Sequence, residues 1–157
     1  MKNFLVFRSA KHPIVNECIE KIIERYTDCT IWLCIQKECI DRYSKFENIR
    51  FIVFPNGMFS FENTIKDKRI VGLLKEVVFD DVYIPYSTLV PECEEIEKII
   101  LNILSIKKAV YYGRDGSFKK KKLEIIRISI EKFTKKFCHS LDYFFVKLIY
   151  ILCFARR

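Results

Sequence analysis

Short apolar runs alternate along the chain with longer segments in which apolar residues recur every three or four positions. The runs are rich in β-branched and aromatic residues, as expected of strands that are covered on both faces. They lie at residues 3–7, 30–35, 49–54, 82–86 and 109–112. The alternation predicts an α/β fold in which about five parallel strands form a Rossmann-like sheet with flanking helices, followed by a long C-terminal helix.

The segments between the apolar runs fit helices. The clearest apolar stripe follows Pro13, a residue favoured in the first turn of a helix, and continues to Tyr26. Residues 37–43 predict a short helix and residues 61–76 a mostly helical stretch. A further helix is predicted to open at Pro91, with acidic residues toward its start. These segments are long enough to connect parallel strands.

The pattern changes at Phe118, after which four consecutive lysines begin a stretch that reaches Arg157 without Gly or Pro. We predict a Rossmann-like domain over residues 1–117 and a basic amphipathic helical tail over residues 118–157. The final apolar part of the tail, residues 143–155, is shorter than the roughly 20 residues that span a bilayer. We therefore expect the tail to lie on a surface and not to cross a membrane.

The net charge of +8 is concentrated in the same region. Residues 107–157 hold 14 Lys and Arg against 4 Asp and Glu, a net charge of +10, which leaves −2 for residues 1–106. This asymmetry indicates an anionic partner for the C-terminal segment. The large apolar rings of the tail favour acidic lipid headgroups over nucleic acid, because phosphate contacts need no long apolar face.

The apolar face of the tail has a second explanation, which is packing on the sheet or on another subunit. We therefore expect the C-terminal helix to bind either an anionic membrane surface or a protein partner, and nucleic acid is not favoured. The predicted contact residues are Lys119, Lys120, Lys121, Lys122, Phe133, Phe137, Phe144, Phe145 and Leu148.

The seven cysteines indicate neither disulfides nor a metal site. They are odd in number, irregularly spaced and without a C-x-x-C pair. We expect reduced thiols, no metal, no cofactor and a cytoplasmic location, on the inner face of the plasma membrane where the tail binds lipid. The N-terminal apolar segment ends at Arg8 without a small-residue cleavage site, which argues against a signal peptide.

The ends of the predicted strands supply the candidate binding residues, because open α/β sheets bind ligands outside the carboxyl ends of their strands. The loop after the first strand is cationic and polar, but it lacks the glycines of dinucleotide-binding loops. It fits an anion site or an ordinary solvated loop. We assign no catalytic residue. The candidate substrate-binding residues are Arg8, Ser9, Lys11, His12, Tyr86, Ser87 and Gly113.

Three of these segments resemble the N-terminal half of a GT-B glycosyltransferase, especially the heptosyltransferase-like group that acts on cell-surface glycans. They are the first strand and loop at residues 2–8, the FDDVYIPY segment at residues 79–86, and the IKKAVYYG segment at residues 106–113. The second of them is similar to an FDxVxxP pattern. The resemblance implies a domain that holds the acceptor, often near a membrane, while another half binds the nucleotide sugar.

The chain departs from that family in two respects. Its first loop lacks the Gly-rich sequence and the acidic base, and we identify no second domain for the donor. The resemblance therefore implies a half-domain for cell-surface polysaccharide synthesis that works with a catalytic subunit, and it leaves open whether this chain is an enzyme. The alternative is a non-catalytic α/β interaction module whose C-terminal helix docks on a protein partner.

Overall fold

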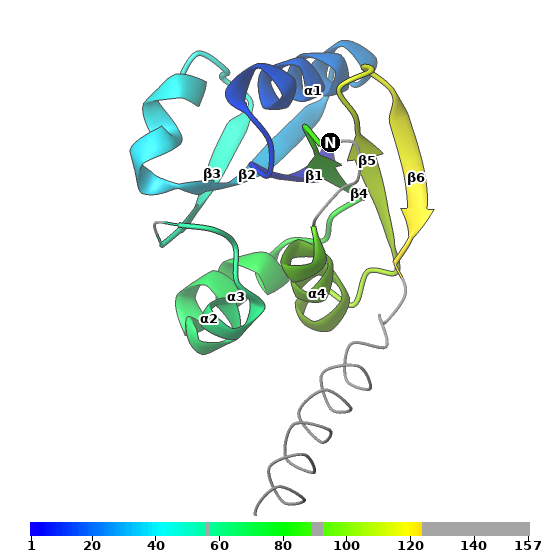
Figure 1. Cartoon of the computed structure of the whole chain (residues 1–157). Helices are drawn as coiled ribbons and strands as arrows, with labels where there is room; N and C mark the ends of the chain where they lie inside the picture. The colour runs from blue at the N-terminus through cyan, green and yellow to red at the C-terminus, as the bar shows by residue number, and fades with distance from the viewer. Residues whose placement is uncertain (56, 89–92, 124–157) are drawn as a thin grey trace, which may run out of the picture. The chain divides into compact units, whose positions relative to one another are not determined.

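The structure is a computed structural model that describes residues 1–55, 57–88 and 93–123 and shows a mixed α/β domain (Figure 1). A six-stranded sheet has the order β3-β2-β1-β4-β5-β6. The first five strands are parallel, and β6 is antiparallel to β5. The strands are β1 (Lys2–Phe7), β2 (Cys29–Gln36), β3 (Ile49–Phe54), β4 (Asp81–Pro85), β5 (Lys108–Tyr112) and β6 (Phe118–Lys122). The predicted parallel α/β sheet is confirmed, with one antiparallel strand added.

Helices cover both faces of this sheet (Figure 1). The chain builds outward from β1 to β3 and then returns to the centre at β4, so the helices of its two halves fall on opposite faces. One face carries α1 (His12–Arg25) and the 3-10 helix η1 (Lys37–Tyr43). The other carries α2 (Phe61–Lys66), α3 (Lys68–Glu76) and α4 (Glu94–Ile103).

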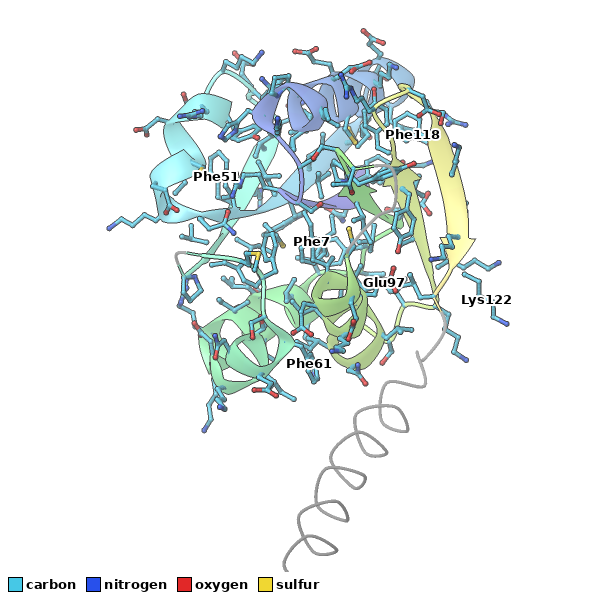
Figure 2. The ribbon with its side chains drawn as sticks, in the orientation of Figure 1. Phe7, Phe51, Phe61, Glu97, Phe118 and Lys122 are labelled. Atoms are coloured by element: carbon cyan, nitrogen blue, oxygen red, sulfur yellow. The ribbon has the colours of Figure 1, made fainter. Side chains whose placement is uncertain are left out.

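Each face of the sheet has its own apolar core. In β1, Phe4 and Val6 point toward the core beneath α1, whereas Leu5 and Phe7 point toward the core beneath α2, α3 and α4. Phe7 lies at the centre of the molecule in Figure 2. A strand that is covered on both faces must be apolar at successive positions, which explains the continuous apolar runs of the sequence.

The stretch over residues 61–76 is two helices that meet at Asp67. The Asp67 carboxylate accepts hydrogen bonds from the backbone N–H groups of Arg69 and Ile70, at 3.0 and 3.1 Å. It therefore caps α3, and its own extended backbone ends α2. The prediction of a mostly helical segment is confirmed, but the break came from a capping residue that we had not singled out.

The helix predicted from Phe118 does not begin there, because Phe118–Lys122 is a strand. The turn before it is the reason. Gly116 has a φ of 71°, and the N–H of Gly113 donates to the carbonyl of Ser117 at 3.2 Å. Such a turn reverses the chain into a hairpin and lays β6 alongside β5.

Aromatic packing fixes β6 in this place. The ring of Phe118 lies 5.7 Å from that of Tyr83 and 4.8 Å from that of Tyr112, between ring centroids. Leu123, just after the strand, is buried in the core beneath α4. The domain boundary predicted after residue 117 therefore falls inside the sheet.

Part of the predictions concerns residues that the structure does not describe. Pro91 is one of them, and the described part of α4 starts at Glu94. Of the predicted tail contacts, Phe133, Phe137, Phe144, Phe145 and Leu148 lie outside the described residues. Among the helices within residues 1–55, 57–88 and 93–123, none is long and apolar enough to cross a membrane.

Candidate functional site

The carboxyl ends of β1 and β4 lie side by side at the centre of the sheet. β1 pairs with both β2 and β4, and the chain continues from β1 toward one edge and from β4 toward the other. In sheets of this order, ligands bind where the connections diverge in this way. The predicted loop that begins at Arg8 follows β1, and Tyr86 follows β4.

Ser9 joins these two loops. Its hydroxyl donates to the carbonyl of Pro85, the last residue of β4, at 2.6 Å. The N–H of Tyr86 in turn donates to the carbonyl of Tyr112 at the end of β5, at 2.9 Å. Hydrogen bonds therefore tie the ends of three neighbouring strands together. Because the Ser9 hydroxyl donates its proton to Pro85, it can accept a hydrogen bond from a ligand but cannot donate one.

Tyr86 and Gly113 are in close contact on the β5 side. A Cβ atom placed on Gly113 would lie 2.7 Å from the Tyr86 hydroxyl oxygen and 2.6 Å from Oδ1 of Asp115. The glycine therefore leaves room for both side chains. Half-buried Tyr86 also packs edge-on against Tyr111, at 6.2 Å between ring centroids. The predicted residues Tyr86 and Gly113 belong to one cluster.

Asp115 adds a carboxylate that we had not singled out as a binding residue. It accepts from the backbone N–H and the hydroxyl of Ser117, at 3.2 and 2.8 Å. These hydrogen bonds, together with the nearby ammonium of Lys119, hold the pKa of Asp115 below its usual value. The carboxylate is therefore ionised at neutral pH and can accept hydrogen bonds beside Tyr86.

Arg8 is held on the β2 side by a buried glutamine. Gln36, the last residue of β2, is only 2% exposed. Its amide oxygen accepts from Nε of Arg8 at 2.7 Å, and its amide nitrogen donates to the carbonyl of Gly57 at 2.9 Å. Within the described part of the chain, Nε is the Arg8 nitrogen with a hydrogen bond, and the two terminal nitrogens have neither hydrogen bond nor ion pair.

His12 lies close to the same cationic group. Its Nδ1 is 2.9 Å from the hydroxyl of Tyr43 at the end of η1. Burial, followed by the positive charges of Arg42 and Arg8, lowers the pKa of His12. Burial likewise raises the pKa of Tyr43 to about 12. At neutral pH the pair is therefore a neutral imidazole hydrogen-bonded to a neutral phenol.

The predicted substrate-binding residues thus divide into two groups. Arg8 and His12 lie toward β2, Tyr86 and Gly113 lie toward β5, and Ser9 connects the ends of β1 and β4. The two remaining candidates contribute less: Lys11 is exposed at the start of α1, and Ser87 is half-buried beyond β4.

Three further residues of the β2 side were not predicted: Gln36, Arg42 and Tyr43. Gln36 carried a signal, because it is the first polar residue after the apolar run of the second strand and so stands at a carboxyl end like Arg8. Arg42 and Tyr43 carried none. Only the turn of η1 back toward α1 brings them beside His12.

The described residues offer no metal site. No group of three or more His, Cys, Asp or Glu side chains that could hold a metal ion is found among them. The five cysteines in the described ranges are all buried. Burial raises the pKa of Cys18, Cys29 and Cys34, so these thiols stay protonated and unreactive at neutral pH.

The predicted lysine run occupies the exposed edge strand β6. Successive residues alternate between the faces of the sheet, so Lys119 and Lys121 share a face with Tyr111, and Lys120 and Lys122 share the opposite face. Lys119 pairs with a carboxylate of the turn at 3.3 Å, and Lys120 pairs with one of β4 at 2.7 Å. All four lysines are exposed.

No family model, curated protein or solved structure matches this chain. The similarity to GT-B glycosyltransferases therefore remains a prediction from three sequence segments.

Proposed function

We propose that this chain is the acceptor-binding half-domain of a glycosyltransferase system for cell-surface glycans and works with a catalytic subunit. One observation supports the proposal: five of the seven predicted substrate-binding residues lie at or just beyond the carboxyl ends of neighbouring strands, on either side of Ser9, and sheets of this order bind ligands at these ends. These residues are Arg8, Ser9, His12, Tyr86 and Gly113.

The chemistry of the cluster suits a sugar. Sugar hydroxyl groups donate and accept hydrogen bonds, and the site offers both kinds of partner. Arg8 has two terminal nitrogens available as donors, and the ionised carboxylate of Asp115 is an acceptor. The half-buried ring of Tyr86 adds an apolar surface against which a pyranose can pack.

We further propose that the lysines of β6 draw the protein to an anionic membrane, where lipid-linked acceptors lie. Four consecutive exposed lysines support this, because lysines near an anionic leaflet each contribute about 1 kcal/mol to binding. The alternative is that the same basic segment docks on a protein partner. Lipid binding by the intact chain separates the two.

The acceptor function is tested by titrating the isotope-labelled full chain with hexoses, heptoses and their 1-phosphates while recording amide NMR spectra. We expect at least one of these sugars to shift the amide signals of Ser9, Tyr86 and Gly113 in a saturable way, and UDP-glucose to bind no tighter than glucose 1-phosphate. Tyr86→Ala should abolish the shifts, and Lys45→Gln, on the exposed segment after η1, should leave them unchanged.

An interaction module without a ligand site predicts a different outcome. None of the sugars would then shift these three amides, and the acceptor proposal would be abandoned. Tight binding of UDP-glucose with weak binding of every sugar phosphate would also contradict it, since that is the behaviour of a donor half.

A further inference from the structure

We infer that Arg8, His12 and Arg42 form a phosphate-binding site, and that the acceptor held by this domain is therefore a phosphorylated sugar. The identity of the sugar rests on the proposed function, whereas the binding of phosphate does not. The cluster comprises a loop residue after β1, the first residue of α1 and a residue of η1.

The first step of the argument is that Arg8 is oriented before any ligand arrives. The amide of Gln36 is almost fully buried and is bonded at both ends, to Nε of Arg8 and to the carbonyl of Gly57. The guanidinium plane is thereby fixed, and its two terminal nitrogens form a fork of N–H donors. Such a fork matches two oxygens of a phosphate group.

The second step concerns charge. The positive charges of Arg8 and Arg42 both act on His12 and on Tyr43, which are joined through Nδ1 and the phenol hydroxyl. The ion pairs formed within the described ranges include neither arginine. Two like charges that are not ion-paired repel each other, and a bound dianion would offset this repulsion.

The third step is the proton on His12. When the Tyr43 hydroxyl donates to Nδ1, the neutral imidazole carries its proton on Nε2. His12 can then donate to an anion without being charged. It also begins a helix of 14 residues that has no acidic side chain in its first turn and no side-chain cap, so the positive end of the helix dipole adds to the attraction.

The experiment is calorimetric titration of the full chain with inorganic phosphate, glucose 1-phosphate and glucose. We expect inorganic phosphate to bind, and Arg8→Lys to weaken binding about tenfold, because lysine keeps the charge but loses the fork. Arg42→Gln should also weaken binding. Arg25→Ala is the matched control, because it removes an exposed arginine at the far end of α1 and should change phosphate affinity less than about twofold.

Gln36→Leu tests the orientation directly. It leaves all positive charges in place but releases Arg8. Phosphate affinity should therefore fall, while the dependence of that affinity on salt concentration should stay the same. Where this variant melts early, Arg8→Lys decides the question, since Arg8 is half-buried and a lysine fits its position. Unchanged phosphate affinity in Arg8→Lys, or an equal loss in Arg25→Ala, would overturn the phosphate site.

The calorimetric and NMR titrations together separate this inference from the proposed function. If phosphate binds through Arg8 but glucose and other sugars never reach Tyr86, the phosphate site stands and the acceptor function fails. If neutral sugars shift Tyr86 and Gly113 while Arg8→Lys has no effect on phosphate, the acceptor function stands and the phosphate site fails.

Discussion

Gly113 and Gly72 both lack a side chain, but only at Gly113 would neighbouring atoms occupy the space of a Cβ. Gly113 lies at the carboxyl end of β5, where a Cβ would come within 3.0 Å of the Tyr86 side chain and of Asp115. Gly72 lies on the exposed side of α3, and no atom lies within 4 Å of where its Cβ would be. The first glycine makes room for site residues, whereas the second only lowers the stability of a helix.

Replacing each of these glycines by alanine should therefore have opposite effects. Gly72→Ala should raise the free energy of unfolding by roughly 0.5–1 kcal/mol, because alanine is the better helix former. Gly113→Ala should lower it and weaken sugar binding, because the Tyr86 hydroxyl and Asp115 must move. Urea unfolding measures the stability of both variants, and ligand titration measures sugar binding by Gly113→Ala. Equal stability changes in the two variants would contradict the contact at Tyr86.

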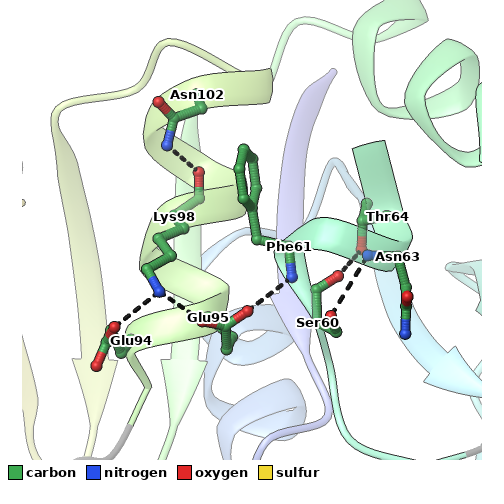
Figure 3. A network of polar contacts seen from close by, with 8 residues as sticks. All are labelled: Ser60, Phe61, Asn63, Thr64, Glu94, Glu95, Lys98 and Asn102. Atoms are coloured by element: carbon green, nitrogen blue, oxygen red, sulfur yellow. Dashed lines mark hydrogen bonds and ion pairs between the residues drawn. The ribbon is translucent and has the colours of Figure 1, made fainter. Parts of the chain in front are cut away.

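At the scale of secondary-structure elements, α2 and α4 are linked by a polar network on their exposed side (Figure 3). The N–H of Phe61, the first residue of α2, donates to Oε2 of Glu95 in α4 at 2.9 Å. Lys98 bridges Glu94 and Glu95 at 2.7 and 2.6 Å. Glu95 thus acts as a cap from another helix, and it ties α2 to the sheet through α4.

Glu95→Ala should lower the free energy of unfolding by about 1 kcal/mol, because it removes the acceptor for a helix N–H together with an ion pair. Glu94→Ala is the matched control, since it also removes a first-turn acid and an ion pair with Lys98 but no bond to α2, and it should cost at most about 0.5 kcal/mol. Thermal or urea unfolding of the two variants gives the comparison. A loss in Glu94→Ala as large as in Glu95→Ala would show that the helix-to-helix bond contributes nothing.

At the scale of the whole described domain, the proposed ligand site lies at the carboxyl ends of the parallel strands, and the last lysine of β6 lies at their opposite ends. Lys122 pairs with Lys108 at the start of β5, whereas Gly113 follows the end of β5. The five residues of β5 separate these two ends by about 17 Å, at 3.3 Å per residue. An acceptor anchored in a membrane beneath Lys122 would have to extend over this length to reach Tyr86.

The membrane proposal predicts that the full chain floats with vesicles that contain phosphatidylserine and not with vesicles of phosphatidylcholine alone. Lys121→Gln combined with Lys122→Gln should weaken vesicle binding by up to about 30-fold, from about 1 kcal/mol for each lysine. Lys45→Gln, an exposed lysine outside β6, serves as the control. Binding that is unchanged in the double variant, or lost equally in the control, would favour a protein partner for this segment.

The candidate site was predictable in part, for a reason that lies in the topology. Residues directly after strands reach the carboxyl edge in any parallel sheet, so Arg8, Ser9, Tyr86 and Gly113 could be placed from the strand pattern alone. Arg42 reaches the site only because η1 turns back toward α1, and the pattern of apolar residues does not predict this turn.

The buried acid of α4 shows the same limit. Glu97 is one of the acidic residues in the first turn of its helix, yet it is 7% exposed and accepts a hydrogen bond from the hydroxyl of Tyr111 in β5. Burial and this bond raise the pKa of Tyr111, so the phenol stays neutral. Spacing along a helix marks the face that a residue occupies, but only a partner on another element makes burial of a carboxylate tolerable.

The sequence by itself determined the five parallel strands and the helices between them, because burial on both faces requires continuous apolar runs and burial on one face requires a stripe. Tertiary structure decided whether the lysine run forms a strand or a helix. Four identical residues have neither a period of two nor one of 3.6, so they favour neither strand nor helix. Pairing with β5 through the turn at Gly116, and the packing of Phe118 on Tyr83, made them a strand.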